Sequence, residues 1–171
     1  PIADICKEAG AVAIIQLNHT GYTSNPECGK PIGPSAITRM GFRGEYTTVE
    51  MTKDEIRKMQ EKFIQAARRA QKAGYDGIQL HGCHGYLINQ FISPLTNLRE
   101  DEYGKSMADK ARFAGEIIAG IRQECGADFL ISVRTSGYEG SLENAIRVAE
   151  EYVKAGCDYL QVSHGVAGLD T

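Results

Sequence analysis

Residues 74–94 read Gly-Tyr-Asp-Gly-Ile-Gln-Leu-His-Gly-Cys-His-Gly-Tyr-Leu-Ile-Asn-Gln-Phe-Ile-Ser-Pro. The glycine at position 74 ends a helical stretch, and the apolar run over residues 75–80 is typical of a buried strand. His81, His84 and Tyr86 follow at once. In an α/β barrel the loops that leave the carboxyl ends of the strands converge on one face, where the chemistry is done. The stretch therefore predicts a barrel strand with a polar cluster at its end.

The same plan recurs along the chain. A Gly-x-Asp sequence followed by an apolar run begins at Gly74, Gly126 and Gly156, and residues 10–17 have the plan without the aspartate. Near-continuous apolar strands of this kind belong to parallel sheets that are covered on both faces. The pattern predicts at least four parallel strands.

Helical stretches lie between these strands. Thr52 and Glu55 have the spacing of a capping box, and apolar residues then recur at helical spacing as far as Ala70. A second helix is expected over about residues 106–122, and a third over residues 141–155. The alternation of strand and helix is that of an α/β fold.

Two long connections, residues 19–51 and 82–105, interrupt this alternation, and both leave the carboxyl ends of expected strands. Such loops bind ligands in barrels and in doubly wound folds. No Gly-x-Gly-x-x-Gly or Walker-type sequence follows any strand, which favours a barrel over a nucleotide-binding Rossmann unit. A full barrel takes about 250 residues. We therefore expect residues 1–171 to form one partial (β/α)8-barrel domain whose missing strands lie outside the chain.

The composition is that of a soluble globular protein. Of its 171 residues, 42% are hydrophobic and 24% charged, and the formal net charge is −3. The net charge gives no sign of the clustered excess of Lys and Arg that binding to nucleic acid or an anionic membrane would need. No apolar run approaches the roughly 18 residues that cross a bilayer. A small-molecule substrate and a cytoplasmic location are expected. The five cysteines are scattered, which indicates reduced thiols rather than a disulfide framework or a structural zinc site.

Polar side chains recur at the ends of the four expected strands, and all four histidines of the chain are among them. Any single histidine could be a hydrogen-bonded structural residue. Their recurrence at four strand ends favours a functional cluster instead. The residues concerned are Gln16, His19, His81, His84, Arg134 and His164.

His81 and His84 admit two interpretations. As metal ligands they lack a carboxylate at ligand spacing and a third histidine nearer than His19 or His164, so no metal is predicted. As neutral imidazoles, each can direct an N–H group at one anionic or carbonyl oxygen. Tyr86, two residues further on, is within reach as a proton donor.

Arg134 and Gln16 also admit both a structural and a ligand-binding role. Arg134 ends the apolar run over residues 129–133, where a cation needs an anion or an electron-rich ligand as its partner, and a structural salt bridge would also satisfy it. The amide of Gln16 can bond the donor and acceptor edge of a heterocycle, or simply a neighbouring loop.

One combination of motifs is far more specific than these single residues. Residues 81–94, then residues 97–104 (Asn-Leu-Arg-Glu-Asp-Glu-Tyr-Gly) and Arg112-Phe113, resemble the signature of the Old Yellow Enzyme family of FMN-dependent oxidoreductases. Residues 16–21 (Gln-Leu-Asn-His-Thr-Gly) and 34–37 (Pro-Ser-Ala-Ile) resemble the third-strand region of that family. The chain departs from the family pattern at Tyr22, at Lys105 and over residues 108–110, Ala-Asp-Lys.

The resemblance implies a (β/α)8 barrel that binds FMN at its C-terminal face. This chain would supply about strands 3 to 6 with their helices, lacking the first two and the last two strands. His81 and His84 would hold the carbonyl oxygen of the substrate, and Tyr86 would deliver a proton to one alkene carbon while the flavin gives hydride to the other. Gln16 would bond the pyrimidine edge of the flavin, and Arg134 would lie near its N1 and C2 carbonyl.

The expected function is that of an ene reductase, which takes electrons from NADH or NADPH and reduces the activated C=C bond of an enone or enoate. A homo-oligomer of the full-length protein fits this expectation. Two rival interpretations remain open. One is a catalytically incompetent barrel fragment, or half-barrel, that acts only by association with another chain. The other is a metal-dependent barrel hydrolase or aldolase that uses the histidines.

Overall fold

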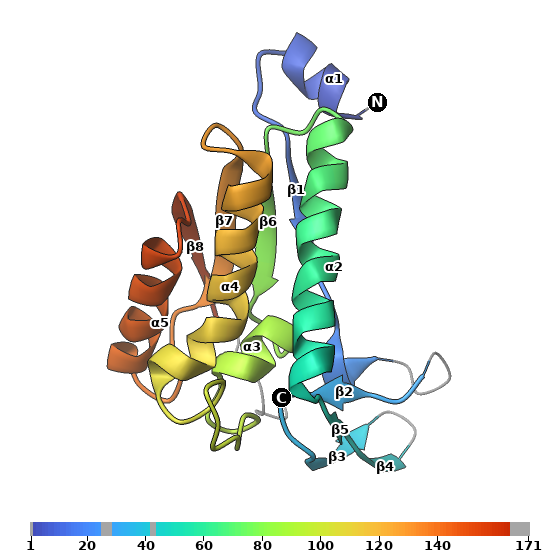
Figure 1. Cartoon of the computed structure of the whole chain (residues 1–171), viewed down its shortest axis with the longest axis vertical. Coiled ribbons are helices and arrows are strands. Elements are labelled where there is room, and N and C mark those ends of the chain that lie inside the picture. Colours follow the sequence, from blue (N-terminus) through green and yellow to red (C-terminus); the bar gives the residue numbers. More distant parts are fainter. Residues whose placement is uncertain (1, 25–28, 42–43, 165–171) are drawn as a thin grey trace.

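A computed structural model describes residues 2–24, 29–41 and 44–164 (Figure 1). Four parallel strands, β1 (Ile14–Leu17), β6 (Gly77–Gly82), β7 (Leu130–Ser136) and β8 (Tyr159–Ser163), form the central sheet in the order β1-β6-β7-β8. This order follows the chain without the reversal that marks a doubly wound sheet. The four predicted strands are confirmed, and their order is that of consecutive barrel strands.

Three long helices, α2 (Lys53–Lys72), α4 (Met107–Cys125) and α5 (Leu142–Lys154), cover one face of this sheet (Figure 1). The predicted capping box of α2 is present, because Thr52 and Glu55 exchange hydrogen bonds. Helix α4 runs beyond its expected end at residue 122, because Cys125 still packs in the core and Gly126, at φ 85°, only then turns the chain.

The hydrophobic core fills the space between the sheet and these helices. Ile78, Leu80 and Val133 of the strands are fully buried against helix residues that include Ile117 and Phe113. Burial of each such side chain contributes roughly 1.5–3 kcal/mol. This core makes the sheet a rigid support for the loops at its carboxyl edge.

The repeated Gly-x-Asp sequence has a second role besides ending helices. The Asp76 carboxylate accepts the backbone N–H of Ala13 at 2.8 Å, and Asp158 accepts that of Ile131 at 2.7 Å. Each aspartate therefore joins the start of its own strand to the start of the preceding strand in the sheet. Two of the three repeats are therefore explained by strand alignment as well as by helix termination.

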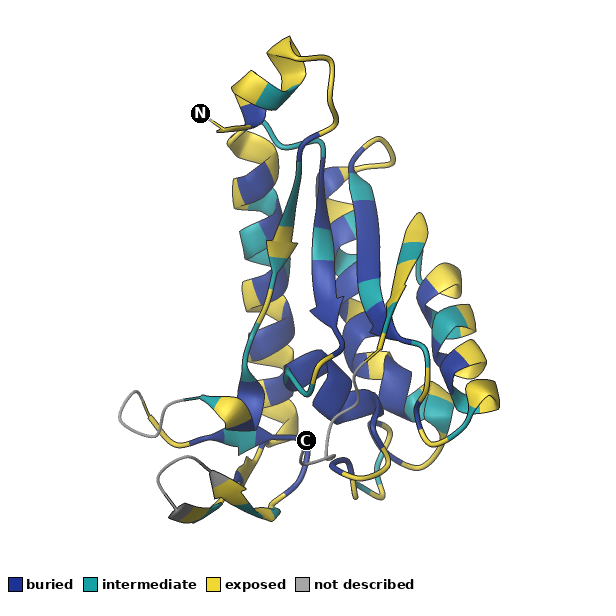
Figure 2. Cartoon of the chain, turned by 180° about the vertical axis from the view of Figure 1, so that it is seen from behind, coloured by how far each residue is buried: buried dark blue, intermediate teal, exposed yellow. Residues whose placement is uncertain are grey.

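The other face of the sheet has no helix over it in the part of the chain that the structure describes (Figure 2). A row of polar side chains crosses it, since Gln16 donates to Gln79 at 2.8 Å and Gln79 donates to Ser132 at 3.0 Å. The edge strand β8 is largely exposed, with Val162 at 69%. A polar interior face and an open edge are what a partial barrel presents.

Several short elements were not predicted. They are α1 (Ile2–Glu8), η1 (Gly21–Thr23), β2 (Ile32–Gly33), β3 (Thr38–Gly41), β4 (Gly44–Thr47), β5 (Val49–Glu50) and α3 (Leu87–Ile92). β2 pairs with β5 and β3 pairs with β4, so the first long loop contains two small sheets at the carboxyl edge of the main one. Elements this short leave no readable periodicity in a sequence.

Arg99 ties the two long loops together. Its side chain is 6% exposed and donates to Asp101 at 2.6 Å within the second loop. It also donates to the carbonyl oxygens of Pro34 at 2.9 Å and Met51 at 2.7 Å, which belong to the first loop. Lys110, at one of the departures from the family pattern, donates to the carbonyl of Asn97 and stabilises the same region.

No helix among the described residues is long and apolar enough for a membrane span.

Candidate active site

The candidate site lies at the carboxyl end of β6, where the chain makes a tight turn. His81 is in the strand, and residues 83–86 form the turn that leads into α3. His84 and Gly85 both have left-handed backbones, with φ of 60° and 74°. A non-glycine residue with positive φ costs free energy and persists where its surroundings fix it, often at functional sites.

The turn brings His84 and Tyr86 next to His81. The ring centroid of His81 lies 5.2 Å from that of His84 and 5.1 Å from that of Tyr86. His81 is only 5% exposed, and neither of its ring nitrogens has a hydrogen-bond partner among the described residues. A buried polar group of this kind is costly unless a ligand satisfies it. The predicted cluster is therefore present, and both ring nitrogens of its central residue are unsatisfied.

Burial lowers the pKa of His81, and the nearby His84 and Arg134 lower it further. His81 is therefore a neutral imidazole at neutral pH. A neutral imidazole carries one N–H donor, which suits it to bind an oxygen in which negative charge develops.

Arg134 lies beside His81 on the next strand, since the two residues are paired in register between β6 and β7. Its Nη2 donates to Ser163 Oγ at 3.2 Å, and its buried Nε has no partner among the described residues. Ser163 Oγ also lies 2.9 Å from His84 Nε2. Either atom of the Ser163–His84 contact can be the donor, depending on the tautomer of His84, so Ser163 links Arg134 to the histidine cluster.

Gln16 lies on the same face of the sheet as His81 and Arg134. Its register partner Gln79 is two residues before His81, and side chains two apart on a strand point the same way. Gln16 is exposed and hydrogen-bonded to Gln79, so it lies one row below the histidine cluster rather than within it.

The two remaining histidines stand apart from this cluster. His19 Nδ1 accepts the N–H of Gly21 at 3.0 Å, and the His19 carbonyl accepts the N–H of Leu87 at 2.9 Å. Burial, then Lys62, lowers the pKa of His19. His19 thus shapes the loop after β1, while His164 is exposed directly after β8.

A metal interpretation can be tested against the same residues. The ligand atoms of His81, Cys83 and His84 all lie within 4.8 Å of one another, and sequence reasoning had overlooked the thiol. Burial, however, raises the pKa of Cys83, so its thiol is protonated in the absence of a metal. The guanidinium of Arg134 also acts on both His81 and Cys83 and would repel a cation. The charges favour an anion or a carbonyl oxygen.

Two buried amides of α3 hold the turn, and sequence reasoning missed both. Asn89 Oδ1 accepts the N–H of Gly85 at 2.8 Å, and Gln90 Nε2 donates to the Gly85 carbonyl at 2.7 Å. The Gly85 residue is therefore fixed at both of its backbone polar groups. One signal was available in the sequence, since amides within the apolar run of residues 87–92 must find partners when buried.

Gly21 allows Gln90 to reach the first loop, so Gly21→Ala should destabilise the protein. Gly21 has φ 60°, and an added Cβ would stand 2.1 Å from Gln90 Oε1. We expect a loss of about 1–3 kcal/mol in unfolding free energy from the collision, measured by denaturant titration. Gly10→Ala is the control, because Gly10 has φ 73° and nothing within 4 Å of its Cβ position. Equal losses in both variants would show that the collision with Gln90 is unimportant.

Glu139, in the loop after β7, also supports the turn after β6 through Asn89, and the sequence analysis did not predict it. It is 1% exposed, and Asn89 Nδ2 donates to its Oε1 at 2.7 Å. Burial raises the pKa of Glu139 to about 7, although hydrogen bonds from Ser136 and Asn89 oppose the rise.

This shift predicts a pH-dependent stability. The unfolded chain loses the Glu139 proton near its ordinary pKa of 4.5 and the folded protein near 7, so stability falls as pH rises between these values. The contribution is on the order of 3 kcal/mol. Glu139→Gln should flatten that part of the pH dependence in denaturant titrations at pH 5, 7 and 8. Glu143→Gln, at an 80% exposed side chain, should not. The same slope in Glu139→Gln as in the unaltered protein would contradict the assignment.

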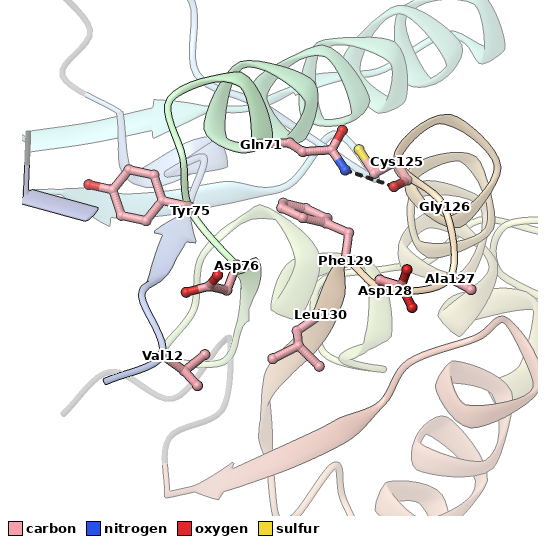
Figure 3. Close-up of a pocket in the computed structure, with 10 residues that line it drawn as sticks. All are labelled: Val12, Gln71, Tyr75, Asp76, Cys125, Gly126, Ala127, Asp128, Phe129 and Leu130. Atoms are coloured by element: carbon pink, nitrogen blue, oxygen red, sulfur yellow. Dashed lines mark hydrogen bonds between the residues drawn. The ribbon is translucent and has the colours of Figure 1, made fainter. Parts of the chain in front are cut away.

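A separate pocket of about 450 Å³ lies at the opposite, amino end of the strands (Figure 3). Two of its polar side chains already have partners, since Gln71 donates to the Cys125 carbonyl at 2.7 Å and Asp76 accepts from Ala13. It offers none of the unsatisfied groups found at the histidine cluster. The carboxyl edge is therefore the candidate active site.

Together, consecutive parallel βα units with a cluster of donors at their carboxyl edge are the arrangement found in part of a (β/α)8-barrel enzyme. The sequence profile of the NADH:flavin oxidoreductase / NADH oxidase family matches residues 1–161. The chain belongs to this family, and the resemblance drawn from the motifs is confirmed. FMN is the flavin of the family, and the buried donors of His81 and Arg134 fit an electron-rich cofactor and substrate.

Named relatives agree with this assignment. The chain is 40% identical to an NADPH dehydrogenase of Clostridium acetobutylicum, over 93% of this chain and 48% of the relative. It is 39% identical to an NADH oxidase of Thermoanaerobacter brockii, over 96% of this chain and 26% of the relative. The chain thus spans about half the length of the NADPH dehydrogenases that it matches.

Solved structures confirm the fold class. A 2-naphthoyl-CoA reductase in complex with 2-naphthoyl-CoA superposes with a TM-score of 0.88 at 31% identity, covering 96% of this chain and 28% of that one. The Old Yellow Enzyme homologue from Zymomonas mobilis superposes with a TM-score of 0.85 at 26% identity, covering 100% of this chain and 55% of that one. The chain is therefore part of an Old Yellow Enzyme-type barrel, as predicted.

Proposed function

We propose that this chain forms the substrate-binding part of an FMN-dependent NAD(P)H oxidoreductase that reduces the activated C=C bond of α,β-unsaturated carbonyl compounds. The observation that carries the proposal is His81, a buried neutral imidazole with both ring nitrogens unsatisfied, beside His84 and Tyr86. An enone or enoate offers the carbonyl oxygen that such a site lacks.

Each group at the site has a proposed role in the reaction. When bound and reduced by NAD(P)H, FMN would supply the hydride that the alkene carbon β to the carbonyl receives. Negative charge then develops on the carbonyl oxygen, where N–H groups of His81 and His84 stabilise it. The phenol of Tyr86 gives its proton to the α carbon and regains one from solvent, so that one hydride and one proton are added across the double bond.

Gln16 and Arg134 are proposed to hold the cofactor. Both lie on the helix-free face of the sheet, and the Arg134 Nε donor lacks a partner among the residues described. A guanidinium can donate to ring nitrogen and carbonyl positions and stabilise added negative charge. The Gln16 amide offers both a donor and an acceptor to a heterocycle edge.

One structural relative supports the proposed substrate class. This relative is a reductase bound to 2-naphthoyl-CoA, whose thioester carbonyl is conjugated with carbon–carbon double bonds. A conjugated thioester would present its oxygen to His81 and His84 in the same way as an enone. We therefore propose conjugated carbonyl compounds as a class.

The first test is the absorption spectrum of the purified chain and of a version extended to the full barrel, after FMN is added and the excess is removed. Flavin bands in the extended protein, bleached by NADH or NADPH and restored by an enone, are the expected result. Absence of flavin from both proteins would contradict the proposal and favour a half-barrel that acts only by association. Activity lost to a chelator without any flavin would favour metal chemistry.

A further inference from the structure

Glu139 is linked to the candidate active site by a chain of two hydrogen bonds. Its Oε1 accepts from Asn89 Nδ2 at 2.7 Å, and Asn89 Oδ1 accepts from the backbone N–H of Gly85 at 2.8 Å. Gly85 lies between His84 and Tyr86, the two side chains that the turn brings to His81. A buried acid on the loop after β7 is thereby connected to the turn after β6.

This chain of bonds fixes which way the Asn89 side chain faces. An amide can present either its oxygen or its NH2 group to Gly85, but only the oxygen can accept the Gly85 N–H. At Oε1 the Glu139 carboxyl group acts as an acceptor, so it selects the orientation in which Asn89 Nδ2 faces Glu139 and Oδ1 faces Gly85. All of this occurs in the interior, where Asn89 is 0% and Glu139 is 1% exposed.

We propose that Glu139 is a positioning residue for the ligand-binding turn: by orienting the Asn89 amide, it holds Gly85 and so keeps His84 and Tyr86 directed at His81. The turn needs such support because two successive residues, His84 and Gly85, have left-handed backbones. The inference rests on the proposed function, since it assigns to Glu139 a role in placing the donors that bind the carbonyl oxygen.

The groups that face the Glu139 carboxyl come from four elements. They are Asn89 of α3, Ser136 of β7, Tyr152 of α5 and Cys83 in the turn after β6. In addition, Asn144 Nδ2 donates to the Glu139 backbone carbonyl at 2.8 Å, which anchors the loop on α5. Glu139 Oε2 has no partner among the described side chains, so Gln can replace Glu139 and keep the Oε1 acceptor.

The test measures how tightly the intact, flavin-loaded protein binds 4-hydroxybenzaldehyde, a simple phenol, from the change that it causes in the flavin spectrum. Glu139→Leu removes the acceptor and should weaken binding about tenfold or more, while flavin content stays unchanged. Glu139→Gln keeps the acceptor and should bind within about threefold of the unaltered protein. Glu143→Gln, exposed on α5, is the control and should leave binding unchanged.

A second pair of variants reverses the hydrogen bond. Asn89→Asp at pH 8 places two acceptors against each other and should weaken binding about tenfold. Adding Glu139→Gln to Asn89→Asp restores a donor, now on residue 139, and should recover most of the affinity. This pair decides the question even if Glu139→Leu does not fold, because both changes are polar and nearly isosteric. A double variant no tighter than Asn89→Asp would overturn the proposal.

Failure of this proposal is distinguishable from failure of the proposed function. If Glu139→Leu binds the phenol as tightly as the unaltered protein while loss of His81 and His84 abolishes binding, the function stands and the positioning role is wrong. If loss of both histidines leaves phenol binding intact, the proposed site itself is wrong.

Discussion

Replacing both His81 and His84 with alanine in the full-length protein should abolish the binding of enones and phenols and leave the flavin in place. Both histidines lie at the end of β6 and are proposed to bind the oxygen of the ligand, whereas Gln16 and Arg134 on the sheet face are proposed to bind the cofactor. Loss of one preorganised donor at such a site costs about 10²–10³ in rate, so loss of both should reduce enone turnover at least that far.

The experiment titrates each variant with 4-hydroxybenzaldehyde and records the flavin spectrum. His81→Gln combined with His84→Asn is the matched control, because amide side chains keep an N–H donor at each position. We expect this control to retain measurable binding where the alanine variant has none. Unchanged phenol affinity in the alanine variant would remove both histidines from the ligand site.

Tyr86→Phe should slow alkene reduction by about 10²–10⁴, the usual contribution of a positioned acid, and leave reduction of the flavin by NAD(P)H within about twofold. The two half-reactions differ because only the second one needs a proton at carbon. Tyr86 is half-buried, and its ring centroid lies 5.1 Å from that of His81, within reach of a molecule held there.

Stopped-flow absorbance of the flavin separates the two half-reactions. Tyr138→Phe is the control, because Tyr138 is 55% exposed on the loop after β7 and has no assigned role in the site. Equal slowing of both half-reactions in Tyr86→Phe would contradict a proton-donor role and would indicate a general loss of site geometry.

The elements of the fold that could be predicted are those with long, regular patterns. The four strands and the helices α2, α4 and α5 carry apolar periodicity and end signals such as the Thr52 capping box. Helix α3 could not be predicted, because all six of its residues are buried and no polar face marks its period. The small sheets of the first loop have strands of two to four residues without a continuous apolar run, whereas the equally short β1 lies within the apolar run of residues 10–17.

Only some residues of the candidate site could be predicted from the sequence. His81, His84 and Tyr86 are close in sequence, and their proximity at a strand end was sufficient to group them. Glu139 lies 50 residues from Asn89 along the chain, and the two meet only because β6 and β7 are neighbours in the sheet. Contacts that depend on how strands pack leave no local pattern, so this part of the site required the structure.

Arg99 has a consequence for how proteins of this kind can be recombined. Since one guanidinium donates to Asp101 in the second loop and to the Pro34 and Met51 carbonyls in the first, neither loop is an independent module. A chimera that exchanges only one loop with a relative risks leaving a buried cation without its partners. Grafts meant to change substrate preference should therefore transfer residues 19–51 and 82–105 as a pair.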